Sequence, residues 1–460
     1  MQSVEIDSYE IKAGQRGNVK TALLISVLFT LVLLVNEPIM SAAGLGWCLF
    51  LFLLFVIRLG QGFPVLELML LMAALQWIVG AKISYVSEFE HFKYYMYVPE
   101  GEYMQLVVPG VIALSLGVLI FFPKYSFEQV NYDLRKLMVE QKNIAYILIA
   151  IGLLSTYAVS YIPSVLRFVL YLTASFQFVG LGLLLFQPHS KTKWRWFILI
   201  MGGLTISSIK QGMFHDLLLW SALLFSIVII QLKIRFFGKL SLIFMGFMMA
   251  FLLQSIKADF RSQLGDKTTV EKIILFTGLI QESAEFGETK DEETTTEMAI
   301  LRLNQGWIIT AILDNMPANE PFVGGETVIE AIKSSLLPRF LYPNKKEAGG
   351  RENFRKFTGL PINDSTSMGA SVIGEGYANF GMEGAWIFMF LWGAFLAWGF
   401  SKLVKYGQKH PVIFAFIPLI FLQVIKAETE LVVVLNHFIK SLILVFGFLW
   451  AARRFLHWKV

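Results

Sequence analysis

The chain has 460 residues, of which 56% are hydrophobic and only 16% are charged, and its formal net charge is +5. Soluble globular chains carry roughly a quarter charged residues, so this composition excludes an ordinary soluble domain. Cations at the cytoplasmic ends of membrane helices would explain the positive charge. No DNA- or RNA-binding motif occurs, and we expect no nucleic-acid partner. The single cysteine, Cys48, excludes a disulfide within the chain.

Apolar runs suited to crossing a hydrocarbon layer of about 30 Å follow one another along the sequence. They cover residues 21–36, 39–57, 64–80, 106–122, 143–162, 164–186, 194–209, 213–231, 238–256, 382–400, 411–425 and 431–450. We therefore expect an all-α polytopic integral membrane protein with about 12 transmembrane helices. The first run is expected to stay in the protein, because no small-residue cleavage site follows it.

Loops rich in lysine and arginine alternate with loops that are nearly uncharged or of mixed charge, and this alternation predicts which loops lie on the cytoplasmic side. With a cytoplasmic N-terminus, the basic loops all fall inside, and both termini are cytoplasmic. The chain then divides into an N-terminal membrane region of about nine spans (1–256), a large extracytoplasmic loop (257–381) and a C-terminal membrane region of about three spans (382–460). The bilayer is the first partner that this division implies.

The large outer loop contains several predicted helices. Thr268 and Glu271 form a capping box that opens an apolar helix in the membrane interface. An acidic stretch from Glu282 to Glu297 is typical of a solvated linker. A buried helix over 297–317 and an amphipathic helix over 325–338 follow, and the glycines after them favour irregular structure.

The stretch LLPRFLYPNKKEAGGRENFRKF, residues 336–357, is strongly basic for an outer loop. Together with Lys333 it holds seven cations and only two acids, Glu347 and Glu352. One interpretation is a solvated loop, since long loops are translocated regardless of their charge. The other is an anion site, with phosphate as the obvious anion at a membrane surface.

A glycine-rich stretch, NDSTSMGASVIGEGYANFGMEGAW, leads from the outer loop back into the membrane. Its five glycines between Gly369 and Gly384 permit close approach of the backbone. Its polar residues either contribute to a site or merely cap the helix that follows.

Three stretches resemble the bacterial oligosaccharide repeat-unit polymerases, the Wzy-type O-antigen polymerase family. The first match comprises Pro338, Arg339, Phe340, Pro343 and Lys345. The second comprises Gly374, Glu375, Tyr377, Asn379, Phe380 and Gly381. A third, weaker match is TISSIKQGMFHDLLLW, where Lys210 stands in place of the arginine that is common in the family.

The resemblance implies an enzyme of the bacterial cytoplasmic membrane that acts at its periplasmic face. It would transfer a growing glycan from undecaprenyl diphosphate to a hydroxyl of the next lipid-linked repeat unit. The product would be O-antigen, capsule or exopolysaccharide. A chain-length-determining co-polymerase is a further expected partner, and no cofactor is expected.

Candidate site residues follow from this chemistry. Cations stabilise a departing diphosphate, and a positioned base takes the acceptor proton. The catalytic candidates are Arg339 for the diphosphate and Glu375, then His215, then Asp364 for the base. Diphosphate-binding candidates are Arg302, Lys345, Arg261 and Lys210. Glycan-binding candidates are Tyr342, Tyr377, Asn379, Arg351 and Arg355. No metal-ligand spacing occurs among the six histidines, so we expect metal-independent chemistry.

Other functions share parts of this pattern. An O-antigen ligase has similar architecture and the same donor, but its outer loop depends on a histidine, and residues 257–381 contain none. A lipid-linked oligosaccharide flippase also has about twelve spans, but it has internal repeats and lacks such a large loop. A membrane O-acyltransferase would require a histidine constellation within the spans.

Overall fold

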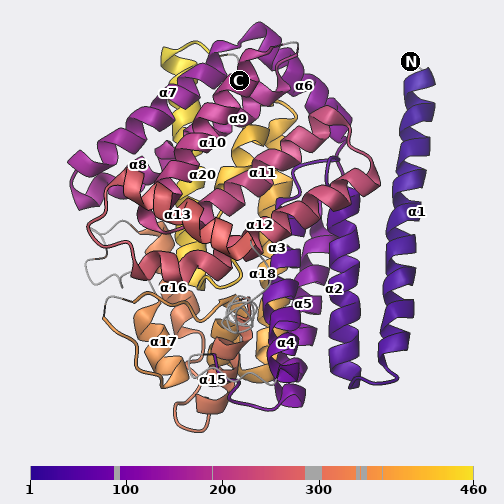
Figure 1. Ribbon diagram of the computed structural model, residues 1–460. Helices are drawn as coiled ribbons and strands as arrows, with labels where there is room; N and C mark the ends of the chain where they lie inside the picture. Colours follow the sequence, from indigo (N-terminus) through magenta and orange to yellow (C-terminus); the bar gives the residue numbers. More distant parts are fainter. Residues whose placement is uncertain are drawn as a thin grey trace.

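The computed structural model describes residues 2–87, 94–188, 190–284, 303–337, 342, 350–364 and 366–458. Its regular elements in these ranges are all helices (Figure 1). In the first half of the chain they are α1 (Gln2–Leu33), α2 (Ile39–Arg58), α3 (Val65–Ala74), η1 (Leu75–Val79), α4 (Gly80–Val86), α5 (Glu100–Phe121), α6 (Phe127–Glu140), α7 (Asn143–Ala158), η2 (Val159–Tyr161), α8 (Ser164–Ala174), α9 (Phe176–Phe186), α10 (Thr192–Gln211) and α11 (His215–Leu232). The second half contains α12 (Phe236–Ser262), α13 (Thr269–Ala284), α15 (Gly306–Asn315), α16 (Glu326–Leu336), α17 (Arg351–Thr358), α18 (Val372–Gly407), α19 (Ile413–Ile420) and α20 (Leu431–Phe455).

Nine helices within the described residues are long and apolar enough to cross a membrane, so the chain is a multi-pass α-helical membrane protein. They are Ile39–Arg58, Val65–Val86, Glu100–Phe121, Asn143–Tyr161, Arg167–Phe186, His215–Leu232, Phe236–Ser262, Val372–Gly407 and Leu431–Phe455. Each corresponds to one of the expected spans.

The other three expected spans do not meet both conditions. The run at 21–36 lies in α1, whose apolar part, Asn18–Leu33, is shorter than the nine. The run at 194–209 lies in α10, whose ends carry lysine and arginine. The expected helix over 411–425 is wrong as a continuous element, because α19 ends at Ile420 and the chain then runs without a helix to Glu430.

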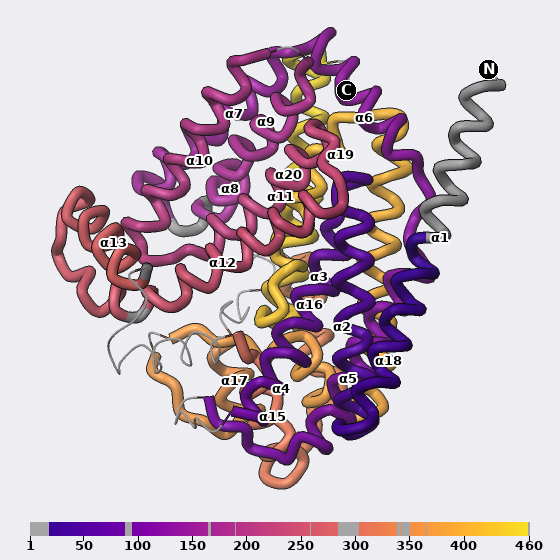
Figure 2. Tube along the Cα trace, turned by 45° about the vertical axis from the view of Figure 1, so that its right-hand side comes forward, coloured from indigo at the N-terminus to yellow at the C-terminus, as the bar shows by residue number. Residues whose placement is uncertain are grey.

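Different helices lie at the two ends of the molecule, and the sidedness of the chain stays a prediction. The end of α20 and α6 lie at the top of Figure 1, whereas α4, α15 and α17 lie at the bottom. Figure 2 shows the same separation after a turn of 45°. Helices α15 and α17 of the expected outer loop thus lie at the end opposite to α6, whereas α13 of the same loop lies between the two ends.

Helices α5 and α18 approach each other unusually closely along their length. A Cβ added at Gly117 of α5 would overlap the carbonyl oxygen of Phe390, and one added at Gly393 of α18 would overlap that of Leu114. Small residues at such a contact allow two backbones to pack without side chains between them. This glycine contact makes α5 and α18 one packed pair.

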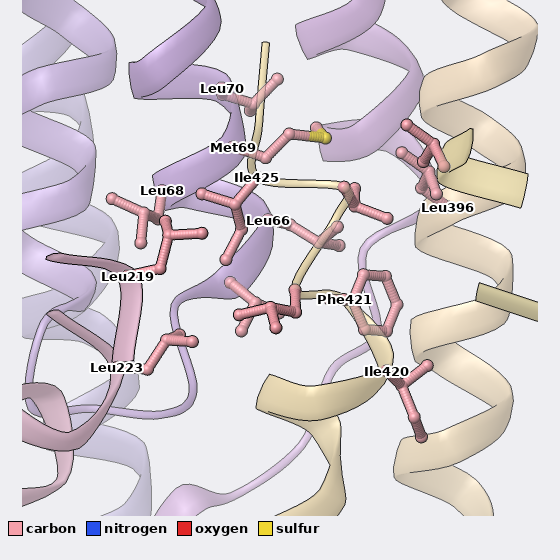
Figure 3. Close-up of a cluster of buried hydrophobic side chains, with 14 of the residues drawn as sticks. Leu66, Leu68, Met69, Leu70, Leu219, Leu223, Leu396, Ile420, Phe421 and Ile425 are labelled. Atoms are coloured by element: carbon pink, nitrogen blue, oxygen red, sulfur yellow. The ribbon is translucent and has the colours of Figure 1, made fainter. Parts of the chain in front are cut away.

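The membrane interior is filled by large apolar side chains from distant parts of the chain. Figure 3 shows Leu66 and Met69 of α3 near Phe421, with Leu219 and Leu223 of α11 on one side. Phe421 is fully buried although it follows the last residue of α19. The non-helical segment after α19 is therefore enclosed by protein, which is where irregular backbone is tolerated at membrane depth.

Candidate functional site

Helix α18 is divided at the point where the outer loop was expected to enter the membrane. Ser371 caps its start, accepting a hydrogen bond from the Gly374 N–H at 3.3 Å. At Gly381 the backbone has φ 70° and ψ −167°, a conformation that favours glycine. The first part, 372–380, thus forms a short helix of its own that carries Glu375, Tyr377 and Asn379.

Two of these side chains tie the outer elements to α18. Asn379 is 1% exposed; its Oδ1 accepts the Gly325 N–H at 3.0 Å, and its Nδ2 donates to the Thr327 hydroxyl at 2.7 Å. The buried Tyr377 hydroxyl donates to the Met316 carbonyl at 3.0 Å. Both are candidates for binding glycan, which stays a prediction, and in the structure their side chains hold α16 and the end of α15.

Glu375, the first candidate for the base, lies behind the surface and is 1% exposed. Its Oε2 accepts the backbone N–H of Leu431, the first residue of α20, at 2.9 Å. The Thr327 hydroxyl is a second hydrogen-bond partner. The carboxylate therefore joins α18, α16 and α20 at one buried point.

A small polar pocket lies at the starts of three helices. It has a volume of about 30 Å³. Its lining residues are Thr327, Glu330, Gly350, Arg351, Glu352, Asn353, Glu430 and Val432. Except for Glu330, in the second turn of α16, they lie at the starts of α16, α17 and α20. Three carboxylates, those of Glu330, Glu352 and Glu430, line this pocket together with one cation, Arg351, so the pocket suits groups that donate hydrogen bonds, such as hydroxyls.

An apolar groove of about 720 Å³ begins beside this pocket. Its walls are Val328, Ile332 and Leu336 of α16, Phe380, Gly384, Ile387, Phe388, Leu391, Trp392 and Phe395 of α18, and Leu431, Leu435 and Ile439 of α20. The two spaces share no lining residue, but residues adjacent in the sequence line them. Thr327 lines the pocket and Val328 the groove, and Leu431 lines the groove between Glu430 and Val432 of the pocket. The starts of α16 and α20 thus contribute to both a polar pocket and an apolar groove.

Helix α17 carries the two expected glycan-binding arginines. Arg351 and Arg355 both pair with Asp364, at 3.8 and 2.9 Å, and donate to the backbone carbonyls of Asp364 and Ile362 respectively. Arg351 also lines the pocket, whereas Arg355 does not. Asp364, the third candidate for the base, is 83% exposed and is engaged by both arginines.

Tyr342 lies against α16. Its hydroxyl donates to Glu330 Oε2 at 2.6 Å, and this bond raises the pKa of the phenol above its ordinary value. Since Glu330 lines the pocket, Tyr342 contacts the site through that carboxylate.

The remaining candidates gather at the turn between α10 and α11. Arg261 Nε donates to the Gly212 carbonyl at 2.8 Å, so it holds this turn, while Lys210 is exposed in the last turn of α10. His215 Nδ1 lies 3.6 Å from Glu428 Oε1, in the segment between α19 and α20. None of these three candidates lines the pocket.

Three candidates, Arg302, Arg339 and Lys345, lie outside the described residues. In the sequence, Arg339 and Lys345 fall between Leu337, at the end of α16, and Gly350, which lines the pocket. Among the described residues, no group of three His, Cys, Asp or Glu side chains could hold a metal ion. Metal-independent chemistry stays a prediction.

Sequence reasoning missed Thr327, Glu330, Asn353 and Glu430. The Asn353 amide donates to Glu430 Oε2 at 3.4 Å across 77 residues of sequence. The sequence contained a weak signal for two of them. Glu430 directly precedes the apolar helix α20, and Thr327 lies in the first turn of the amphipathic helix α16. Nothing in the sequence indicates that these helix starts meet.

Residues 79–449 match the model of a family described as a domain of unknown function (DUF8712). The match covers most of the chain, which therefore belongs to this family. No curated protein and no solved structure matches the chain.

Proposed function

We propose that this protein is a polymerase of lipid-linked oligosaccharide repeat units in the bacterial cytoplasmic membrane. It would transfer the growing glycan from undecaprenyl diphosphate to a hydroxyl of the next lipid-linked unit, on the extracytoplasmic face. The resemblance of three stretches to the Wzy-type polymerases supports this type of reaction. The observation that carries the proposal is that adjacent residues of α16 and α20 line an apolar groove and a small polar pocket.

The substrates of such an enzyme have the same division. A polyprenyl tail is apolar and belongs beside membrane helices, and the diphosphate and sugars are polar. The groove is formed by apolar faces of three helices. On the α18 face, Ile387 and Leu391 are 63% and 58% exposed. The pocket, of about 30 Å³, is lined by a hydroxyl, an amide, carboxylates and Arg351, which suit a single sugar hydroxyl.

Cations of the expected outer loop would complete the binding of the diphosphate. Arg351 lines the pocket, and Arg339 and Lys345 belong to the sequence that connects α16 with α17. Charge-assisted bonds from such residues stabilise a leaving diphosphate, because negative charge accumulates on it as the glycosidic bond breaks.

The first test is an extraction of lipid-linked glycans and surface polymer from a strain that lacks the protein. Single repeat units on the carrier, able to reach the outer leaflet, would support polymerisation. Long chains that stay on the carrier would instead indicate a ligase. Repeat units confined to the cytoplasmic leaflet would indicate a transporter.

The second test concerns the groove. Leu391→Trp places a bulky ring in it, and Ile198→Trp places the same ring at an exposed position of α10 outside it. We expect polymer to decrease markedly only in Leu391→Trp, with both variants present in the membrane at equal amounts. Equal polymer from both would remove the groove from the proposal.

A further inference from the structure

We propose that Glu428 positions His215 as the general base that takes the proton from the acceptor hydroxyl. This inference rests on the proposed function and deepens it. The sequence makes His215 one of three candidates for the base, but it does not indicate Glu428. A general base requires a second group that orients it and stabilises the charge that it gains.

His215 and Glu428 form a pair at the start of a membrane-spanning helix. His215 is the first residue of α11, and its Nδ1 lies 3.6 Å from Oε1 of Glu428. This distance is longer than a hydrogen bond, as is common for catalytic pairs before the substrate binds. A carboxylate facing Nδ1 favours the tautomer with its proton there, which leaves Nε2 as the proton acceptor. The same carboxylate stabilises the imidazolium that forms once Nε2 is protonated.

Neighbouring contacts hold Glu428 in front of α11. Two residues earlier in the same non-helical segment, Lys426 Nζ lies 3.5 Å from Asp216 Oδ1. The Tyr171 hydroxyl of α8 donates to the other oxygen of Asp216 at 3.1 Å. Gly369 also packs on the segment, since a Cβ there would lie 2.7 Å from the Glu428 carbonyl oxygen. The segment between α19 and α20 is therefore fixed at two successive residues of α11.

Two atoms of the pair lack a hydrogen-bond partner among the described residues. His215 Nε2 and Glu428 Oε2 are both covered by protein, and no group in the described part of the chain bonds to either of them. Buried polar atoms are nearly always paired, so each leaves a position that a polar group of a ligand would satisfy. The His215 side chain as a whole is 42% exposed. Because exposed side chains reorient rapidly, the ring can turn Nε2 toward a bound hydroxyl.

Cations lie close to the same ring. The charged groups that face it are Asp216, Lys257, Lys426 and Glu428. Arg261, an expected diphosphate-binding residue, fixes the turn before His215 through the Gly212 carbonyl at 2.8 Å. The reaction requires a base and cations for the diphosphate at one centre, and this turn brings the two kinds of group together.

The other two candidate bases are engaged by partners. Glu375 is 1% exposed, and its carboxylate accepts the Leu431 N–H and is bonded by the Thr327 hydroxyl. Asp364 pairs with two arginines of α17. An acceptor hydroxyl would have to displace one of these partners, whereas His215 Nε2 has no partner among the described residues to displace.

The step is balanced without a further reagent. The acceptor oxygen bonds to the anomeric carbon of the donor glycan while its proton moves to His215 Nε2. The bond between that carbon and the diphosphate oxygen breaks, and the diphosphate leaves with the electron pair. The proton of His215 then passes to the solvent or to the departing diphosphate.

The experiment uses the full-length protein in lipid nanodiscs with purified lipid-linked repeat units as donor and acceptor. It compares kcat and KM of the wild-type protein, His215→Gln, Glu428→Gln and the double variant. We expect kcat to fall on the order of 100-fold or more in His215→Gln. In Glu428→Gln it should fall roughly 10–100-fold, as for loss of one hydrogen bond to a charged group. KM for the donor should stay unchanged.

The double variant tests whether Glu428 acts through His215. If it does, Glu428→Gln has no further effect on kcat once His215 is replaced, whereas a merely structural role would lower kcat in both backgrounds. Glu326→Gln and His457→Gln are the matched controls and should keep the wild-type kcat. Glu326 is exposed at the start of α16, and His457 is exposed beyond the far end of α20.

The outcomes separate the two proposals. Absence of polymer from the wild-type protein would reject the proposed function itself. With polymer present, an unchanged kcat in either single variant would overturn the inference, and so would equal effects of Glu428→Gln in the two backgrounds. If Glu428→Gln does not fold, Glu428→Asp takes its place in the same comparison, because it keeps the charge but shortens the reach to His215. A fall in kcat only where His215 is present then supports the inference, and any other result overturns it.

Discussion

Replacement of Glu375 separates a structural role of this carboxylate from a chemical one. Glu375→Ala removes the acceptor of the Leu431 N–H and leaves the Thr327 hydroxyl without one of its partners. A hydrogen bond to a charged group contributes about 1.5–3 kcal/mol, and a buried donor left unpaired costs about 1–3 kcal/mol. We therefore expect a loss of about 3–5 kcal/mol in the free energy of unfolding. Glu375→Gln keeps an acceptor oxygen and should lose only about 1 kcal/mol.

The measurement is an unfolding titration of the purified protein in mixed micelles, followed by tryptophan fluorescence. Glu383→Ala is the control, since Glu383 is an exposed glutamate two turns further along α18. Its free energy of unfolding should change by less than about 0.5 kcal/mol. If Glu375→Ala were as stable as this control, the tie to α20 would contribute little. If Glu375→Gln kept its stability but made no polymer, the result would support Glu375 as the base.

Three further predictions concern the packing and the chemistry. Gly393→Leu should destabilise the protein by about 3 kcal/mol or more, because its Cβ would overlap the Leu114 carbonyl, whereas Gly447→Leu, with nothing within 4 Å of its Cβ, should unfold like the wild type in the same titration. Arg339→Ala should abolish polymer while the protein still inserts in the membrane, and Arg339→Lys should recover part of the activity; normal polymer from the alanine variant would exclude Arg339 from the site. Polymerisation by the purified protein should be insensitive to EDTA, and loss of activity with recovery on addition of Mg²⁺ would contradict metal-independent chemistry.

The membrane helices could be predicted because each apolar run has a local cause. A run of about 20 apolar residues satisfies its own backbone only as a helix, whatever surrounds it. The capping box at the start of α13 is confirmed for the same reason, since Thr268 and Glu271 exchange hydrogen bonds within one turn. The bend at Gly381 also coincides with the predicted end of the outer loop.

Other elements depend on distant partners and were not predicted. The stretch after Gly350 was expected to be irregular, yet Arg351–Thr358 is a helix that buries Phe354 and Phe357. The spacing of these two rings was the available signal, and the surrounding charges obscured it. The pocket could not be predicted from the sequence, because Asn353 and Glu430 come together only when α17 packs near the start of α20.

The close contact between α5 and α18 has a consequence for how such a site can change its substrate. Helix α18 forms one wall of the groove and also packs closely on α5. At Gly117 of α5 and Gly393 of α18 this packing leaves no room for a larger residue. Helix α16 forms another wall with Ile332 and Leu336. These side chains are 46% and 60% exposed, so larger or smaller apolar residues can replace them without disturbing a close helix contact. Selection for a new glycan or a different lipid carrier would therefore find tolerated substitutions mainly along α16. We expect sequence variation among members of the family to be distributed unequally between these two walls.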